Sequence, residues 1–227
     1  MEGLGVIYQD EWIVAVDKPQ GILVHADGTA APTLTGRLRQ RLMSQGTPAA
    51  ELQPLQRLDV DTSGLVLFSL RKEAQPRLDA LVASHALRKS YLAVVEGRFL
   101  AGTRTIDLPL GRDRHDSRRM RVSRTGKPSQ TCVTLLGESG PRSLLRVELL
   151  TGRRHQIRVH LSYLGFPLVG DRLYGRRPRG SQAGLMLHAL EEEFTHPLTG
   201  ERLSLRTPWP ERFERLWPDS SELWPDR

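Results

Sequence analysis

The sequence has little cysteine and no long apolar run. Cys132 is its one cysteine, which excludes a disulfide framework and a thiolate zinc site. No apolar stretch approaches the length of a membrane span. The first residues lack the basic region and apolar core of a signal peptide. We therefore expect a cytoplasmic protein, with 38% hydrophobic residues to form an ordinary core.

Acidic residues are outnumbered by basic ones. The chain has 33 Lys and Arg against 26 Asp and Glu, which gives a formal net charge of +7. Only four of the basic residues are lysines, so 29 are arginines, whose planar guanidinium suits phosphates and bases. This balance favours a polyanionic partner, with nucleic acid as the first candidate. The alternatives are a basic surface without a specific partner and an arginine bias that reflects genomic base composition.

Short apolar runs predict strands along most of the chain. Residues 6–17 hold two such runs around a polar turn at 9–11, which indicates a hairpin. Further strand-like runs cover 22–24, 65–69, 90–95, 131–136, 144–150 and 185–189. Because the strands outnumber the helices and do not alternate strictly with them, we expect a single α+β domain over residues 1–227. Its large mixed or antiparallel sheet is expected to be flanked by helices and loops.

Apolar residues at helical spacing predict three helices. The first contains Leu34, Leu38 and Leu42. The second covers about 72–86, with Pro76 in its first turn. Its apolar face is expected to consist of Leu78, Leu81, Val82 and His85. The third helix covers 154–164, and its polar face is expected to carry His155, Arg158 and Ser162.

The segment with the most chemical information reads Gln-Arg-Leu-Asp-Val-Asp-Thr-Ser-Gly at 56–64. It places Asp59 in a tight polar turn beside an arginine and a glycine, directly before a buried strand. One interpretation is that Asp59 and Asp61 only cap a turn. Another is a metal site with two carboxylates, although the nearby sequence supplies no obvious further ligand.

This segment also resembles the signature of RluA-type pseudouridine synthases, in which Arg-Leu-Asp precedes a Thr-Ser-Gly turn. A second segment, Thr-Gly-Arg-Arg-His-Gln-Ile-Arg-Val-His-Leu at 151–161, is similar to another signature of that family. Further segments agree with the family in the same order along the chain, at 17–21, 89–93, 126–128, 165–171, 187–189 and 196–197. The resemblance thus covers nearly the whole chain. It departs at Gln56, where the family usually has a histidine, and we expect altered packing around the loop but no loss of function.

The resemblance implies an enzyme that detaches uracil from its ribose, rotates it and rejoins it through carbon 5. Such an isomerisation requires no cofactor and no metal, and the expected partner is structured ribosomal or transfer RNA. We expect the catalytic domain alone, without an N-terminal RNA-binding extension, acting as a monomer. A rival is an RNA-binding protein that has lost the chemistry. Another is a metal-dependent nuclease that uses Asp59, Asp61 and the histidines.

The resemblance also assigns roles to particular residues. Asp59 is implied as the catalytic carboxylate, which acts on the ribose, on the base or on the proton next to the anomeric carbon. We expect Arg158 to keep this carboxylate ionised, although a surface arginine that binds phosphate is the alternative. Tyr91 is implied to stack on the uracil, and Leu187 to pack against its other side. Phosphate contacts are expected from the arginine-rich segment and its neighbours, namely Arg118, Arg121, Arg153 and Arg154.

Two more expectations concern the flipped nucleotide and the histidines. The target base must leave its stack before it can react. The family implies that Arg57, next to Asp59, fills the vacated space. His155 and His160 are five residues apart, which differs from the spacing of four on zinc-binding helices. We therefore expect structural roles for both histidines.

Overall fold

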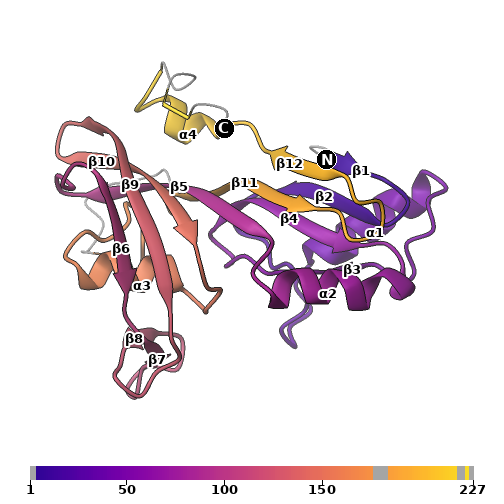
Figure 1. Cartoon of the computed structure of the whole chain (residues 1–227), viewed down its shortest axis with the longest axis horizontal. Helices are drawn as coiled ribbons and strands as arrows, with labels where there is room; N and C mark the ends of the chain where they lie inside the picture. Colours follow the sequence, from indigo (N-terminus) through magenta and orange to yellow (C-terminus); the bar gives the residue numbers. More distant parts are fainter. Residues whose placement is uncertain (1–3, 176–183, 219–222, 225–227) are drawn as a thin grey trace. The chain divides into compact units, whose positions relative to one another are not determined.

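A computed structural model describes residues 4–175, 184–218 and 223–224, and these residues form two compact units (Figure 1). The N-terminal unit comprises Met1–Lys89 and Ala189–Thr207, and the central unit comprises Ser90–His188 and Pro208–Arg227. The expectation of a single domain over 1–227 stays a prediction. Within the described ranges, no helix has the length and hydropathy of a membrane span.

The N-terminal unit is built on a sheet with the strand order β1-β2-β4-β11. These strands are β1 (Gly5–Gln9), β2 (Ile13–Lys18), β4 (Ser63–Ser69) and β11 (Leu187–Thr195), the last of which enters this unit at Ala189. Two short strands, β3 (Gln53–Pro54) and β12 (Arg202–Arg206), pair with β4 and β11. The hairpin expected at 6–17 is confirmed as β1 and β2, which pair antiparallel. Its turn is closed by Asp10, whose Oδ1 accepts hydrogen bonds from the backbone N–H groups of Trp12 and Ile13 at 2.7 and 2.8 Å.

Two helices pack on opposite faces of β2. Successive residues of a strand point to opposite faces, so Val14 and Val16 pack in a core with α1 (Leu34–Ser44). Ile13 and Ala15 pack on the other side in a core with α2 (Gln75–Ala83), which follows a 3₁₀ turn at Lys72–Ala74. The first two predicted helices are therefore confirmed.

Two local predictions in this unit are wrong. His85 does not extend the apolar face of α2, because the helix ends at Ala83 and His85 is exposed with a positive φ of 58°. Residues 22–24 do not form a strand, because Leu23 makes only an isolated bridge to Thr33. The apolar side chains of Ile22 and Val24 are buried nonetheless, so their hydrophobic pattern reflects burial in a loop.

Gly64 shows why the Thr-Ser-Gly turn requires glycine. Its φ is +113°, a conformation that side-chain-bearing residues rarely adopt. A Cβ at this position would lie 2.1 Å from the carbonyl oxygen of Ala189 in β11. The glycine therefore allows β4 to approach β11 closely directly after the Asp59 loop.

The central unit is built on a second set of paired strands, in the order β5-β10-β9-β6. These are β5 (Arg88–Glu96), β10 (Arg142–Leu149), β9 (Gln130–Ser139) and β6 (Thr103–Asp107), and each strand pairs antiparallel with its neighbour in this order. The arginine-rich segment forms a separate hairpin of β7 (Leu110–Arg112) and β8 (Met120–Val122). The helices are α3 (Gln156–Tyr163) and the short α4 (Glu211–Glu214). The predicted α+β class with a large, mainly antiparallel sheet is confirmed.

Helix α3 confirms the third predicted helix. Its polar face is largely buried and not open to solvent. All residues from Gln156 to Leu161 are buried, including Arg158. His155 precedes the helix in the left-handed conformation, with φ 55°. His160 is fully buried, and its two ring nitrogens lie 2.9 Å from Thr131 Oγ1 and from the carbonyl oxygen of Leu108. Since a carbonyl only accepts, Nε2 of His160 carries the proton, and its role is structural as expected.

Candidate active site

Asp59 lies at the tip of the loop that connects β3 to β4. The loop is closed by a hydrogen bond of 3.1 Å from the backbone N–H of Thr62 to the carbonyl of Asp59. Asp59 is half-buried, whereas Arg57 and Asp61 on either side are exposed. Arg57 Nη1 lies 3.4 Å from Nε2 of His25. The turn thus presents the Asp59 carboxylate and the Arg57 guanidinium at the surface of the N-terminal unit.

A fully buried lysine, Lys18, holds this loop through hydrogen bonds to backbone carbonyl groups. Lys18 donates to the carbonyl oxygens of Pro19, Ile22 and Val60 at 3.0, 2.9 and 3.0 Å. All three of its N–H donors are therefore used. Burial lowers the pKa of Lys18 to about 8, against the opposing attraction of Asp59, Asp61 and Asp17. The backbone next to Asp59 is consequently held by a buried ammonium group.

The segment Lys-Pro-Gln-Gly at 18–21 adds two more contacts to the same loop. The backbone N–H of Gly21 donates to the carbonyl of Val60 at 2.8 Å, and Gln20 Nε2 donates to the carbonyl of Asp61 at 2.7 Å. The sequence indicates this segment only through the family resemblance and predicts no role for Lys18. The signal in the sequence is a lysine that follows four apolar residues and Asp17 at the end of a strand and precedes Pro-Gln-Gly.

In the central unit, Arg158 is held by a buried carboxylate. Its Nε and Nη2 donate to Oδ2 and Oδ1 of Asp171, each at 2.8 Å, and the two side chains are 5% and 0% exposed. Oδ1 of Asp171 also accepts from the backbone N–H groups of Leu173 and Tyr174 at 2.8 and 3.0 Å. Burial alone would raise the pKa of Asp171, but the hydrogen bonds and the charge of Arg158 hold this pKa below its usual range. The alternative of a surface arginine that binds phosphate is therefore wrong for Arg158.

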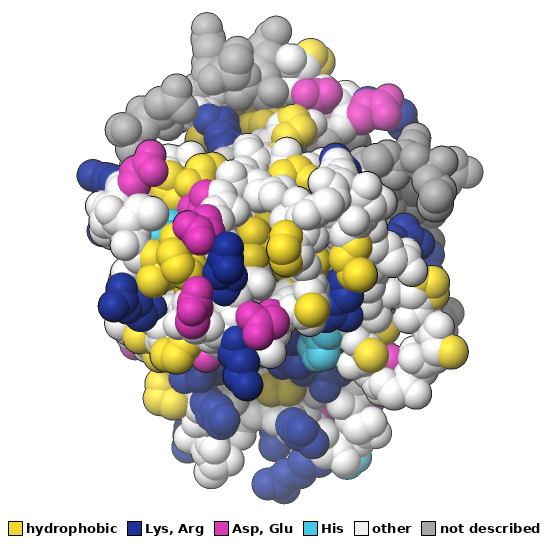
Figure 2. Space-filling view, turned by 90° about the vertical axis from the view of Figure 1, so that its right-hand side faces the viewer, with side chains coloured by type: hydrophobic (Ala, Val, Ile, Leu, Met, Phe, Trp, Pro, Cys, Tyr) yellow, Lys and Arg dark blue, Asp and Glu magenta, His cyan; other side chains and the backbone are white. Residues whose placement is uncertain are grey.

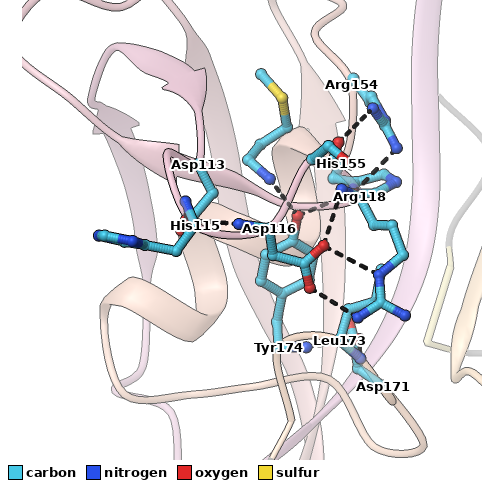
Figure 3. A network of polar contacts seen from close by, with 11 residues as sticks. Asp113, His115, Asp116, Arg118, Arg154, His155, Asp171, Leu173 and Tyr174 are labelled. Carbon is cyan, nitrogen blue, oxygen red and sulfur yellow. Dashed lines mark hydrogen bonds and ion pairs between the residues drawn. The ribbon is translucent and has the colours of Figure 1, made fainter.

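Tyr174 contacts both Arg158 and the arginine-rich hairpin. Figure 3 shows its place beside His155 in the polar network of this unit. Its ring centroid lies 5.2 Å from the Cζ atoms of both Arg158 and Arg119. Its hydroxyl accepts from the backbone N–H of Met120 and lies 2.7 Å from Nδ1 of His155. His155 and Tyr174 thus join the start of α3 to strand β8, a structural role that fits the expectation for His155.

Three of the four arginines expected to bind phosphate already have polar partners within the protein. Arg154 donates to the carbonyl oxygens of Ser117 and Arg118, at 3.4 and 3.0 Å, and so ties the hairpin to the start of α3. Arg153 Nε donates to the carbonyl of Pro128 at 3.1 Å. Arg118 pairs with Asp116 at 2.8 Å but keeps 75% of its side chain exposed, and Arg121 is half-buried. The structure therefore brings Arg118 and Arg154 together, and phosphate contacts of all four stay a prediction.

Tyr91 and Leu187 are both buried. Tyr91 lies in β5, opposite Val147 of β10, and is 6% exposed. Leu187 begins β11 and is 4% exposed. These two residues and Arg158 belong to the central unit, while Asp59 and Arg57 belong to the N-terminal unit. The pairing of Asp59 with Arg158 therefore stays a prediction.

The metal site considered for Asp59 and Asp61 lacks a full set of ligands among the described residues. Across the described ranges, no three His, Cys, Asp or Glu side chains are grouped so that they could hold a metal ion. Asp59 and Asp61 project from one exposed loop, and the buried His160 is engaged elsewhere.

Comparisons with known proteins agree with these features. The family model for RNA pseudouridylate synthase matches residues 12–163. The uncharacterized RNA pseudouridine synthase YlyB of Bacillus subtilis is 37% identical over 219 residues, which cover 94% of this chain and 71% of that protein. Ribosomal large subunit pseudouridine synthase D of Pseudomonas aeruginosa is 37% identical over 229 residues, which cover 94% and 70%.

A solved structure supports the same assignment. Human RNA pseudouridylate synthase domain containing 1 superposes with a TM-score of 0.76 at 29% identity, over 92% of this chain and 84% of that one. The matched family region contains the Asp59 loop, Tyr91 and α3 with Arg158. The chain therefore belongs to the RluA-type RNA pseudouridine synthases, isomerases that convert uridine in RNA to pseudouridine.

Proposed function

We propose that this enzyme isomerises specific uridines of structured ribosomal or transfer RNA, with Asp59 as the catalytic carboxylate. The observation that carries this proposal is the construction of the Asp59 loop. Lys18, Gln20 and Gly21 hold the carbonyl groups of Val60 and Asp61, the two residues that follow Asp59. Side-chain and backbone groups of residues 18–21 therefore hold the loop in one conformation. A carboxylate on such a loop keeps a fixed position relative to a bound nucleotide.

In the proposed reaction Asp59 acts on the nucleotide while the base changes its point of attachment. The bond from N1 of uracil to the ribose breaks, and a bond from carbon 5 forms. The proton on carbon 5 leaves, and N1 gains a proton, so atoms and electrons balance. Attack on the ribose, attack on the base and elimination to a glycal all require this one carboxylate, and we favour elimination.

Arg158 and Tyr91 have supporting roles in this proposal. Arg158 would pair with Asp59 and keep it ionised where water is excluded. The fork with Asp171 uses two of the five N–H donors of its guanidinium and fixes its plane. Tyr91 would stack on the uracil and help to remove the proton from carbon 5, and Leu187 would pack on the other side. Arg57, exposed beside Asp59, would fill the space that the flipped base leaves.

Phosphate binding is assigned to the arginine-rich hairpin and the start of α3. On the face shown in Figure 2, basic and acidic side chains are interspersed over the upper and middle parts of the view. The hairpin of the central unit, in contrast, carries Arg112, Arg114, Arg118, Arg119 and Arg121 between residues 110 and 122. We infer that this basic segment, together with Arg153 and Arg154, contacts the RNA backbone.

Arg121→Ala is expected to weaken RNA binding and to reduce its dependence on salt. Each lost phosphate contact should lower the slope of log affinity against log salt by about 0.7 to 0.9. The slope is measured by titrating one RNA at several salt concentrations. Arg77→Ala, at an exposed position of α2 in the other unit, serves as the matched control and should leave the slope unchanged. Equal slopes for wild type and Arg121→Ala would contradict the assignment.

The RNA target can be found by mapping pseudouridines. Because the similar protein of Pseudomonas aeruginosa is named for the ribosomal large subunit, ribosomal RNA is tested first and transfer RNA second. We expect one or a few pseudouridines to be missing in cells without this gene. Wild-type protein should restore them, and Asp59→Asn protein should not. Unchanged maps of both RNA classes would refute the proposed substrates.

A further inference from the structure

A carboxyl group lies in an apolar row of strand β11. Leu190, Glu192 and Phe194 alternate along the strand with the partly exposed Glu191 and Glu193, so the first three point to one face. They are 0%, 2% and 4% exposed. A buried ionised carboxylate is unfavourable without a cationic partner in contact. An acid at this position therefore calls for an explanation beyond packing.

Glu192 contacts the start of the Asp59 loop. Nε2 of Gln56 lies 2.6 Å from Oε1 of Glu192, although the two residues are 136 positions apart. That distance is short for a bond from an amide N–H, usually about 2.9 Å, and normal for a bond from a hydroxyl, about 2.7 Å. Because the O and N atoms of a glutamine amide are assigned from their partners, a protonated carboxyl that donates to the amide oxygen fits the contact equally well.

The second oxygen of Glu192 argues against an ionised carboxylate, because it is buried and accepts from the described residues no hydrogen bond that would compensate a charge. Within the described part of the chain, Oε1 of Gln56 and Oε2 of Glu192 are buried without a hydrogen-bond partner. A neutral carboxyl offers one donor and one acceptor, which complements an amide in either orientation. Burial raises the pKa of Glu192 to about 8, against the attraction of Lys89 and the hydrogen bond from Gln56. Burial thus favours the neutral, protonated form of this acid.

Gln56 is placed to transmit this contact to the site. It directly precedes Arg57 and stands three residues before Asp59. The last backbone bond before the loop joins the N–H of Leu55 to the carbonyl of Leu67 at 2.9 Å. Lys18 and Gln20 hold the far side of the loop at Val60 and Asp61. The Gln56 side chain is thus an anchor on the near side.

We propose that Glu192 is a positioning residue for catalysis, which acts through Gln56 to fix the segment that carries Arg57 and Asp59. This inference rests on the proposed role of Asp59. It also explains how the chain uses glutamine at position 56, since a neutral amide matches a neutral carboxylic acid. Because the side chain of Glu192 is buried, it is not expected to contact the RNA.

The test compares single-turnover rates and RNA affinities of purified variants on the same unmodified transcript. Glu192→Ala and Gln56→Ala should each lower the single-turnover rate by about tenfold or more, with RNA affinity changed less than about threefold, because a small misplacement of reacting groups is costly. Glu192→Gln, which keeps the volume and a neutral hydrogen-bonding group, should retain the rate within about threefold. Glu193→Gln, the next residue on the other face, is the matched control and should behave as wild type.

A pH series separates positioning from mere stability. The rate of folded wild type should fall relative to that of Glu192→Gln as the pH rises through about 8, where Glu192 ionises. Lys18 lies under the loop in both proteins, so its own titration cancels in the ratio, whereas the attraction of Lys89 only lowers the pKa at which Glu192 ionises. A constant ratio would overturn the proposal.

The remaining outcomes distinguish this inference from the proposed function. If Glu192→Ala or Gln56→Ala folds and reacts at the wild-type rate while Asp59→Asn is inactive, only the positioning role is wrong. If Asp59→Asn is fully active, the proposed function itself fails. Because Glu192→Ala opens a cavity in the core, Gln56→Ala tests the same contact from its partly exposed side.

Discussion

Asp59→Asn is expected to abolish pseudouridine formation while RNA affinity stays within a few fold of wild type. The substitution keeps the size of the side chain and removes its charge and its basic oxygen pair. Loss of a catalytic carboxylate typically lowers the chemical step by about a thousandfold or more. The backbone contacts of the loop come from Lys18, Gln20 and Gly21 to Val60 and Asp61, so the turn should keep its shape. Single-turnover rates and equilibrium affinities on one RNA measure both effects.

Asp61→Asn is the matched control for this experiment. Asp61 lies in the same loop, its side chain is exposed, and its backbone carbonyl already accepts from Gln20. The reaction needs one carboxylate, so this variant should retain substantial activity. A wild-type rate for Asp59→Asn would contradict the assignment, as would a folded but inactive Asp61→Asn protein.

Asp171→Asn is expected to have the second largest effect, on stability and on activity together. The change takes one charge out of a buried ion pair, whose removal typically costs about 3 kcal/mol or more in the free energy of unfolding. It also disturbs the plane of the Arg158 guanidinium, so the single-turnover rate should fall. Denaturant unfolding and single-turnover assays of the folded protein measure the two effects separately. An unchanged free energy of unfolding would show that the fork contributes nothing.

The stability lost in Asp171→Asn depends on pH, and the direction of this dependence follows from the pKa of Asp171. The folded pKa of Asp171 lies below its ordinary value of 3.8, so its ionised form stabilises the fold above that value. This stability is lost as the pH falls through the lower, folded pKa. The difference in Tm between wild type and Asp171→Asn should therefore narrow in acid. Asp116→Asn, which weakens the exposed pair with Arg118, should change Tm little at any pH.

Local sequence patterns predict most of the helices and strands. An element that buries one face carries apolar residues at a regular spacing along the sequence. The hairpin at 6–17 and the helix with Leu34, Leu38 and Leu42 followed directly from spacing. The third helix lies where the spacing predicts it, but spacing alone does not show which partners its polar residues have. Arg158 and His160 are buried and satisfied by Asp171, Thr131 and Leu108.

The support of the candidate site was the part that the sequence did not show. Asp59 and Arg57 were identified through the family motif, whereas Lys18 and Glu192 received no role. Both act over long separations in the chain, Lys18 on Val60 and Glu192 on Gln56. A buried lysine and a buried glutamate look like ordinary charged residues until the fold shows what surrounds them.

The role of Asp59 in a cofactor-free isomerisation is tested by tritium release from RNA labelled at carbon 5 of uridine, with excess chelator present. We expect wild-type protein to release tritium in step with the pseudouridine formed, without strand cleavage and without an added cofactor. Asp59→Asn should release none from the same RNA. Release that stops with chelator while the RNA remains folded, or that continues at the wild-type rate in Asp59→Asn, would contradict the account.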